Sequence, residues 1–279
     1  MVKHYVGGQA LIEGVMMKYK NRLGIAVRNT KGKIIVKRER LKIKDNNIPF
    51  IRGVVNLFVI LYIGFKSLNY SANVSVGKDE EMSIWEMIFS FIFAIIFGLV
   101  LFKFVPLLIT YGLDKIFKVN NILFNVIDGV LKVLIFVTYV YLISLMKDVA
   151  RVFQYHGAEH KAVACHEAGK KLSTKEVQSF HKEHIRCGTS FIFLVLLISI
   201  IIYTFIPKDY GFWLKFELRI LLLPVVASLS YEILRLGARY KWFSFLSYPG
   251  LWIQRITTKE PDDKQVEVAI KALKAAVGN

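Results

Sequence analysis

The sequence predicts an integral membrane protein, mainly an α-helical bundle with about four transmembrane helices and a small N-terminal β-containing region in the cytoplasm. Of the 279 residues, 54% are hydrophobic and 21% are charged, which excludes a disordered chain and exceeds the apolar share of ordinary soluble domains. Residues 87–102 and 188–207 contain no charged side chain, as is typical of membrane-spanning helices. The net charge of +17 fits the excess of Lys and Arg that membrane proteins keep on their cytoplasmic side.

Residues 1–50 form the basic N-terminal region. Residues 23–29 and 33–39 are rich in β-branched side chains and flank a short segment that ends in Gly32, a pattern that predicts two strands joined by a tight turn. Between positions 18 and 44 the chain carries eleven Lys or Arg and one Glu. Since this block holds more than half of the net charge, we expect it to stay in the cytoplasm.

Residues 51–74 predict an interfacial or docked helix. The segment is apolar enough to span a membrane, but it carries Arg52, Asn56, Lys66 and Asn69 within one broad arc of the helix. Such a helix suits the membrane surface or a groove of the bundle. A fifth membrane span is the alternative.

Residues 75–260 form the predicted transmembrane bundle. Four spans are expected, at about 84–106, 121–146, 189–206 and 215–236. The second span contains Asp128 and Lys132, four residues apart on one helix face. Ionisable groups inside a membrane usually have a partner, so we expect an ion pair between these two side chains.

Counting charges gives the topology. With four spans, residues 1–83, 147–188 and 237–279 share one side, and the opposite loops are short and nearly free of charge. The positive-inside rule therefore places the polar segment 147–188 and both termini in the cytoplasm. Residues 261–279 predict a cytoplasmic C-terminal helix that docks through an apolar stripe, with Pro261 and two acidic residues at its start.

Residues 155–161 (YHGAEHK) contain the first candidates for metal ligands and a catalytic base. On a helix, His156 and His160 project from one face about 6 Å apart, the spacing at which two imidazoles share one metal ion. Glu159 completes the order H-x-x-E-H, which occurs in zinc peptidases whose glutamate acts as general base. A chance match within a polar helix is the competing interpretation.

A second metal-competent pair follows just before the third span. His184 and Cys187 add an imidazole and a thiol, and this mixture of ligands suits zinc. If all four residues bind, the site is closed and structural, because catalysis needs an open position. Arg186 is the candidate to hold an anionic group or an oxyanion. The alternative to a metal site is an uncharged polar network that ties the two segments together.

Other polar residues are weaker candidates. Cys165 lies on the far side of the helix from His156, and His166 is expected at the surface. Glu167 is a candidate for a supporting role. Glu232, near the end of the last span, is expected to pair with an arginine, Arg235 or Arg186, and Glu13 is expected at a solvated strand position.

Seven motifs together resemble the bacterial DUF1385 (YqhQ-like) family of membrane proteins. They are residues 7–17 (GGQALIEGVMM), 155–161 (YHGAEHK), 186–191 (RCGTSF), 222–226 (LLPVV), 230–233 (SYEI), 249–254 (PGLWIQ) and 257–263 (TTKEPDD). The resemblance covers nearly the whole chain. It implies a multi-pass protein of the bacterial cell membrane with a metal-dependent activity, and it places the candidate site residues at motif positions.

The leading hypothesis is a zinc-dependent membrane enzyme, hydrolytic, at the cytoplasmic membrane face. His156, His160, His184 and Cys187 are the expected zinc ligands, and Glu159 and Arg186 the expected catalytic residues. The alternative is a non-enzymatic scaffold whose basic cytoplasmic face binds anionic lipid, a membrane-protein partner or ribosomal RNA. A transporter ranks third, because Asp128 and Lys132 are the only polar residues we expect at mid-membrane.

Overall fold

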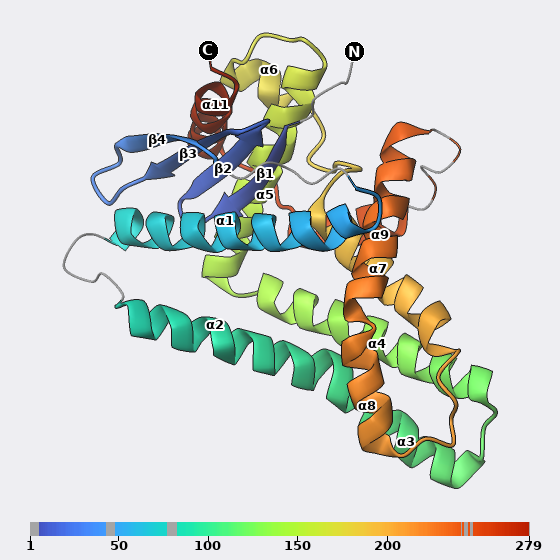
Figure 1. Ribbon diagram of the computed structural model, residues 1–279. Coiled ribbons are helices and arrows are strands. Elements are labelled where there is room, and N and C mark those ends of the chain that lie inside the picture. The colour runs from blue at the N-terminus through green and yellow to red at the C-terminus, as the bar shows by residue number, and fades with distance from the viewer. Residues whose placement is uncertain are drawn as a thin grey trace.

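A computed structural model describes residues 6–42, 48–76, 83–240, 242, 245 and 248–278 of the chain. The molecule has a polar layer, which contains a four-stranded sheet with helices α5, α6 and α11, and an apolar layer of helices below it (Figure 1). The first and last described elements, β1 and α11, both lie in the polar layer.

The sheet is an antiparallel meander in which every strand pairs with its neighbour in sequence. Its strands are β1 (Gly7–Leu11), β2 (Gly14–Tyr19), β3 (Arg22–Arg28) and β4 (Ile34–Arg40). The predicted hairpin corresponds to β3 and β4, and β1 and β2 extend it into a larger sheet. The expected strand position of Glu13 was wrong: Glu13 lies in the β1–β2 turn with φ 51°, and its carboxylate binds Arg151.

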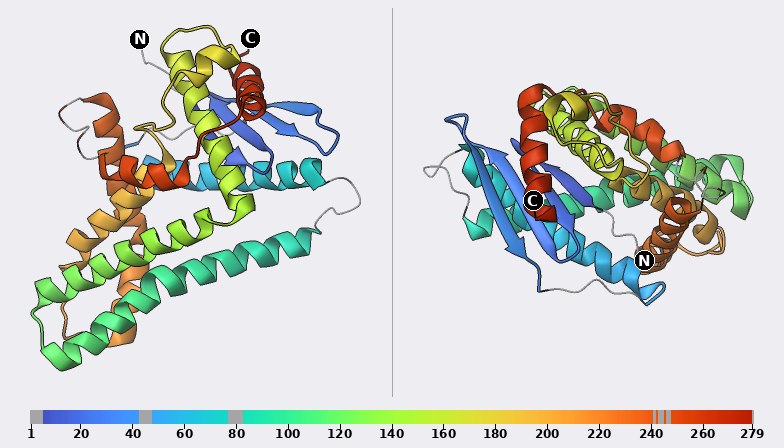
Figure 2. Two further views of the ribbon diagram at one scale, coloured as in Figure 1. Left: turned by 180° about the vertical axis from the view of Figure 1, so that it is seen from behind. Right: turned by 90° about the horizontal axis from the view of Figure 1, so that it is seen from above.

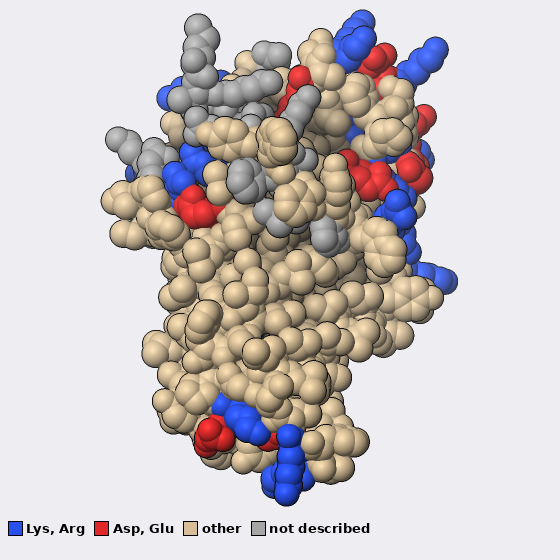
Figure 3. Space-filling view, turned by 90° about the vertical axis from the view of Figure 1, so that its right-hand side faces the viewer, with Lys and Arg blue, Asp and Glu red and all other residues tan. Residues whose placement is uncertain are grey.

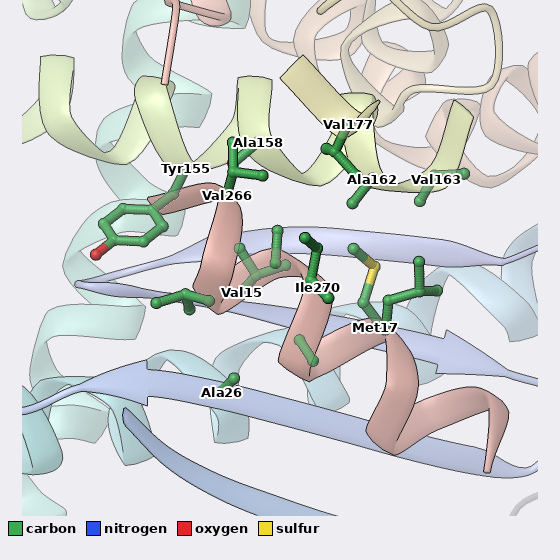
Figure 4. Packing of buried hydrophobic residues seen from close by; sticks show 14 of the residues in the cluster. Val15, Met17, Ala26, Tyr155, Ala158, Ala162, Val163, Val177, Val266 and Ile270 are labelled. Atoms are coloured by element: carbon green, nitrogen blue, oxygen red, sulfur yellow. The ribbon is translucent and has the colours of Figure 1, made fainter. Parts of the chain in front are cut away.

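Alternation along the strands gives the sheet two apolar faces. Val15, Met17 and Ala26 pack against α5 (Lys147–Glu167) and α11 (Asp263–Val277) (Figure 4). The neighbouring positions point the other way, where Met16 and other strand residues pack against Ile63 of α1 (Ile51–Val76). Figure 2 shows α5 and α11 on one face of the sheet and α1 on the other. The sheet therefore fixes α5, the helix that carries the H-x-x-E-H motif.

The predicted C-terminal helix corresponds to α11. The Asp262 carboxylate caps it by accepting a hydrogen bond from the backbone N–H of Gln265 at 2.7 Å, an arrangement that satisfies free donors at a helix start. Val266 and Leu273 are fully buried. The helix approaches the sheet so closely that a Cβ on Gly24 would lie 2.3 Å from the carbonyl oxygen of Ala272, so glycine is required there.

The apolar layer contains helices long enough to cross a membrane. Its elements are α2 (Ile84–Leu99), the π-helical turn η2 (Val100–Phe104), α3 (Val105–Phe117), α4 (Asn121–Ser144), α7 (Gly188–Tyr203), α8 (Phe212–Leu221), α9 (Leu223–Arg239) and α10 (Tyr248–Thr257). Among the described residues, three helical stretches meet the length and composition of a membrane span, namely residues 51–75, 88–117 and 121–144. Helices α8 and α9 make a fourth if they are counted together. In Figure 3 a broad uncharged band separates charged side chains at the two ends of the visible face.

Three of the expected spans differ from the structure. The span expected at 84–106 continues through η2 and α3 to residue 117. The span expected at 215–236 is broken into α8 and α9, which meet at an angle of 43°. Pro224 explains the break, because proline lacks the backbone N–H and its ring clashes with the preceding turn of a helix. The span expected at 189–206 is α7, which has 16 residues and is therefore about 24 Å long, shorter than an average hydrocarbon core.

Helix α1 lies between the sheet and the apolar helices (Figure 1). Although it is long and apolar enough to count as a span, the sheet covers one of its faces. Its first turn is tied to α9, because Nε of Arg52 donates to the Glu232 carboxylate at 2.7 Å. Glu232 thus pairs with an arginine, but with one from α1 rather than Arg235 or Arg186. That α1 stays on one side of the membrane remains a prediction.

Candidate metal centre

Helix α5 presents different residues on two faces. Tyr155, Ala158 and Ala162 are fully buried against the sheet and α11. Because a helix turns once every 3.6 residues, His156 and His160 then point away from this core, toward the segment that leads into α7. Packing of the apolar face thus fixes the direction of both imidazoles.

His156, His160 and Cys187 form a compact group. One ligand atom from each lies within 4.8 Å of the others, and the Nε2 atom of His156 lies 3.2 Å from Sγ of Cys187. The two imidazole ring centres are 4.4 Å apart. Within the described part of the chain this is the only such group of three His, Cys, Asp or Glu side chains. Three of the four expected ligands are therefore in place to share one ion.

Backbone carbonyls set the tautomer of both imidazoles. Nδ1 of His156 lies 2.8 Å from the carbonyl oxygen of Thr257, and Nδ1 of His160 lies 2.5 Å from that of Lys182. A carbonyl only accepts, so each Nδ1 donates, and in a neutral ring the Nε2 atom keeps a free lone pair. Burial lowers the pKa of His160, which favours the neutral ring. Such carbonyl contacts orient histidine ligands in known metal sites.

Cys187 occupies the N-cap of α7. Its sulfur lies 3.1 Å from Oγ1 of Thr189 and 3.5 Å from the backbone nitrogen of the same residue. The start of a helix carries partial positive charge, which stabilises an anionic group. The thiolate is the form of cysteine that binds metals, and the contacts with Thr189 hold the sulfur at this position.

Glu159 lies beside the group without belonging to it. Its side chain is 6% exposed, and no hydrogen bond or ion pair joins its carboxylate to another described residue. Burial raises the pKa of Glu159, and the charges of His156 and His184 only partly oppose that rise. A buried carboxylate with a raised pKa is typical of a general base.

The β1 strand closes the site over Glu159. A Cβ atom on Gly8 would lie 2.5 Å from Oε1 of Glu159, so any larger residue there would displace the carboxylate. Contact with the candidate base therefore explains why glycine stands at position 8.

His184 and Arg186 lie beside the group formed by His156, His160 and Cys187. The His184 ring centre lies 5.7 Å from that of His160, but His184 does not belong to the group of three ligands. Its Nε2 atom lies 3.6 Å from Glu167, whose carboxylate also pairs with Arg186. Burial favours the neutral acid, but the nearby His184 imidazole and the hydrogen bond and charge of Arg186 outweigh it and lower the pKa of Glu167. These residues form an ion-pair network beside the candidate ligands.

Sequence reasoning missed three residues that position the site. The fully buried Gln254 of α10 accepts from the backbone N–H of His184 at 2.8 Å and donates to the His184 carbonyl at 2.9 Å. Thr257 supplies the backbone carbonyl that contacts His156. Gly157 allows the backbone of Lys259 to lie directly against α5, because a Cβ at position 157 would be 2.2 Å from the Lys259 carbonyl oxygen. No periodic pattern reveals such contacts, and only the resemblance to family motifs drew attention to these segments.

The fold and the site define a mostly helical protein with candidate membrane spans, a small antiparallel sheet and one group of metal-competent side chains. The chain belongs to the DUF1385 family, described as proteins of unknown function, which it matches over residues 48–279. It is 34% identical to the uncharacterized protein YqhQ of Bacillus subtilis (strain 168), over 98% of this chain and 93% of that protein. No solved structure matches the chain.

Proposed function

We propose that this protein is a zinc-dependent membrane enzyme, hydrolytic, that works at the cytoplasmic membrane face. The observation that carries the proposal is the convergence of one ligand atom each from His156, His160 and Cys187, while the Nδ1 atoms of both imidazoles lie against backbone carbonyls. Imidazole and thiolate ligands suit zinc. Three protein ligands also leave the fourth tetrahedral position open, as in catalytic zinc sites.

Each nearby side chain has a proposed part in the reaction. A zinc ion held here would act as a Lewis acid toward water and toward a carbonyl or phosphoryl oxygen. Glu159, buried and without a hydrogen-bond partner among the described residues, takes the proton from the attacking water. Arg186 holds an anionic group of the substrate, and its pairing with Glu167 keeps the guanidinium beside the centre. His184 orients this network rather than binding zinc.

The position of the centre supports a substrate at the membrane boundary. Cys187 directly precedes the apolar helix α7, while α5 belongs to the polar layer (Figure 1). Nζ of Lys259, close to the Thr257 carbonyl that holds His156, donates to the carbonyl oxygen of Ser144, the last residue of α4, at 2.8 Å. The candidate ligands therefore lie where the polar layer meets the helices that we propose to span the membrane.

We propose four crossings of the bacterial cell membrane, with both termini in the cytoplasm. The crossings are α2 with η2 and α3, then α4, α7, and α8 with α9, while α1 lies flat at the cytoplasmic boundary. This arrangement is supported by the charged ends in Figure 3 and by the excess of Lys and Arg in the segments that would share the cytoplasmic side. The short α7 is accommodated by local thinning of the bilayer.

The topology predicts opposite labelling at two exposed positions. A cysteine in place of Lys175, in α6 (Thr174–Gln178), should not react with an impermeant maleimide in intact cells. A cysteine in place of Tyr210, in the α7–α8 loop and 41% exposed, should react fully. The unmodified protein gives the baseline, because Cys165 and Cys187 are both buried. Labelling of the Lys175 variant before lysis would contradict four crossings.

The scaffold alternative has one specific observation in its favour. The β3–β4 hairpin exposes Lys31, Lys33, Arg38 and Arg40, and such a cluster at a membrane surface attracts anionic lipid or RNA. The same charges also keep an edge strand from pairing with other sheets. Zinc content distinguishes the two functions, since the scaffold needs none.

A further inference from the structure

A cluster of charged side chains is buried inside the apolar bundle, far from the candidate metal centre. The basic cluster, as we call it, consists of Lys103 of η2, Lys132 of α4, and Lys215 and Arg219 of α8; none is more than 8% exposed. Asp128 of α4 pairs with Lys132, as expected from the sequence, and also with Arg219, whose Nη1 lies 2.7 Å away.

The basic cluster holds more positive charge than its acid can neutralise. Four basic groups face one buried carboxylate, that of Asp128, while the less buried Asp114 and Asp209 act on Lys215 from the side of the loops. The buried groups alone therefore carry a formal excess of positive charge. The Nζ atom of Lys215, which is 1% exposed, has no hydrogen-bond partner among the described residues, and neither does Nε of Arg219. Lys215 lies over the ring of Phe124, with Nζ 4.1 Å from its centre. Burying unneutralised charge in a membrane interior is costly, so the excess points to a bound anion.

Other groups around the basic cluster fix its geometry. Nζ of Lys103 donates to Oη of Tyr203 at 3.0 Å, and that hydroxyl donates to the carbonyl oxygen of Arg219 at 2.9 Å. Nη2 of Arg219 donates to Oδ1 of Asn125 at 2.9 Å. Lys103 lies in a π-helical turn, a feature that recurs at functional sites.

A polar row connects the basic cluster with a hollow at the end of the bundle opposite the sheet. The hollow has a volume of about 600 Å³ and is lined by residues of the α3–α4 and α7–α8 loops, including Asn121 and Lys208. Asn121, Asn125, Asp128 and Lys132 lie on one face of α4, because they are spaced by four, three and four residues. Nδ2 of Asn125 donates to the carbonyl oxygen of Asn121 at 2.9 Å. The row thus leads inward from the hollow.

We propose that the basic cluster binds a phosphate group that reaches it from the hollow. A doubly charged oxyanion offsets most of the excess charge, and its several acceptor oxygens match an arginine fork with lysine ammonium groups. The phosphate belongs either to inorganic phosphate or to a phospholipid headgroup. This site is independent of the proposed zinc centre, because none of its residues comes from α5 or from the segment before α7.

The full-length protein, purified in non-ionic detergent without phosphate, tests the proposal with inorganic phosphate as the probe. Titration calorimetry should show binding to the wild type, and Lys215→Met should weaken it by about tenfold to a hundredfold, the effect of losing a hydrogen bond to a charged group. Lys103→Met serves as the second variant if the first does not fold. Lys115→Met is the matched control, because Lys115 is exposed at the same end of the bundle and should leave binding unchanged.

Native mass spectrometry distinguishes the two sources of phosphate. One phospholipid retained per wild-type chain, absent from Lys215→Met but kept by Lys115→Met, assigns the site to a headgroup. Phosphate binding without a retained lipid assigns it to the free ion. If the wild type binds neither, and Lys215→Met unfolds at a higher temperature than the wild type, the basic cluster is a self-contained network and the proposal is wrong.

Discussion

Replacing His160 with alanine is expected to remove zinc from the protein. The wild type, purified in detergent and supplied with zinc, should retain about one ion per chain, and His160→Ala should retain close to none. The reason is geometric: His160 is one of the three ligand side chains that converge within the described residues. Loss of a supporting contact alone typically lowers metal affinity 10–100-fold, and loss of a ligand lowers it further. Elemental analysis by mass spectrometry measures the stoichiometry.

His166→Ala is the matched control for that measurement. His166 lies on the same helix but outside the group of three ligands, so this variant should keep its zinc. Equal zinc in the wild type, in His160→Ala and in His166→Ala would mean that the metal is bound elsewhere, and a wild type that never retains zinc would favour the scaffold function.

Glu159→Gln is expected to keep zinc and lose hydrolytic activity. The carboxylate is buried beside the ligands but is not one of them, so the amide should leave the metal in place while it cannot accept a proton. General base catalysis typically contributes 10²–10⁴-fold, and the rate should fall by about that factor. Hydrolysis of p-nitrophenyl acetate and of bis-p-nitrophenyl phosphate by zinc-loaded wild type provides the assay.

Glu167→Gln accompanies this variant as its control. Glu167 contacts His184 and Arg186 but not the three ligands, so its replacement should lower the rate far less than Glu159→Gln. Two results would refute the assigned role of Glu159: full activity of Glu159→Gln, or loss of its zinc. No hydrolysis of either probe by the zinc-loaded wild type would count against the enzyme itself.

Periodicity alone predicted the pairing of two of the three side chains in the candidate centre. His156 and His160 share a face because a helix has a fixed repeat, so their pairing follows from spacing. His184 and Cys187 lie in an irregular segment, where no repeat tells which side chain turns toward α5. That choice depends on Gln254, which fixes the His184 backbone from 70 residues away. Sequence reasoning therefore treated both as ligands, whereas the structure brings only Cys187 into the group.

In the fold as well, features set by local sequence patterns were predictable, whereas contacts between distant segments were not. β3 and β4 were predictable because β-branched residues flank a turn, whereas β1 and β2 contain glycine and methionine and give a weak strand signal. The Asp128–Lys132 pair followed from spacing on one helix. The sequence did not predict that Lys103 and Lys215 lie near this pair, because they come from other helices and the packing of those helices cannot be derived from the sequence pattern.

X-ray absorption spectroscopy at the zinc edge of the zinc-loaded protein tests the central claim most directly. The ligands His156, His160 and Cys187 predict one sulfur at about 2.3 Å and two imidazole nitrogens at about 2.0–2.1 Å, with one further light atom in the open position. In Cys187→Ser the sulfur shell should disappear. A wild-type spectrum without sulfur, or with two or more sulfur neighbours, would contradict the proposed centre.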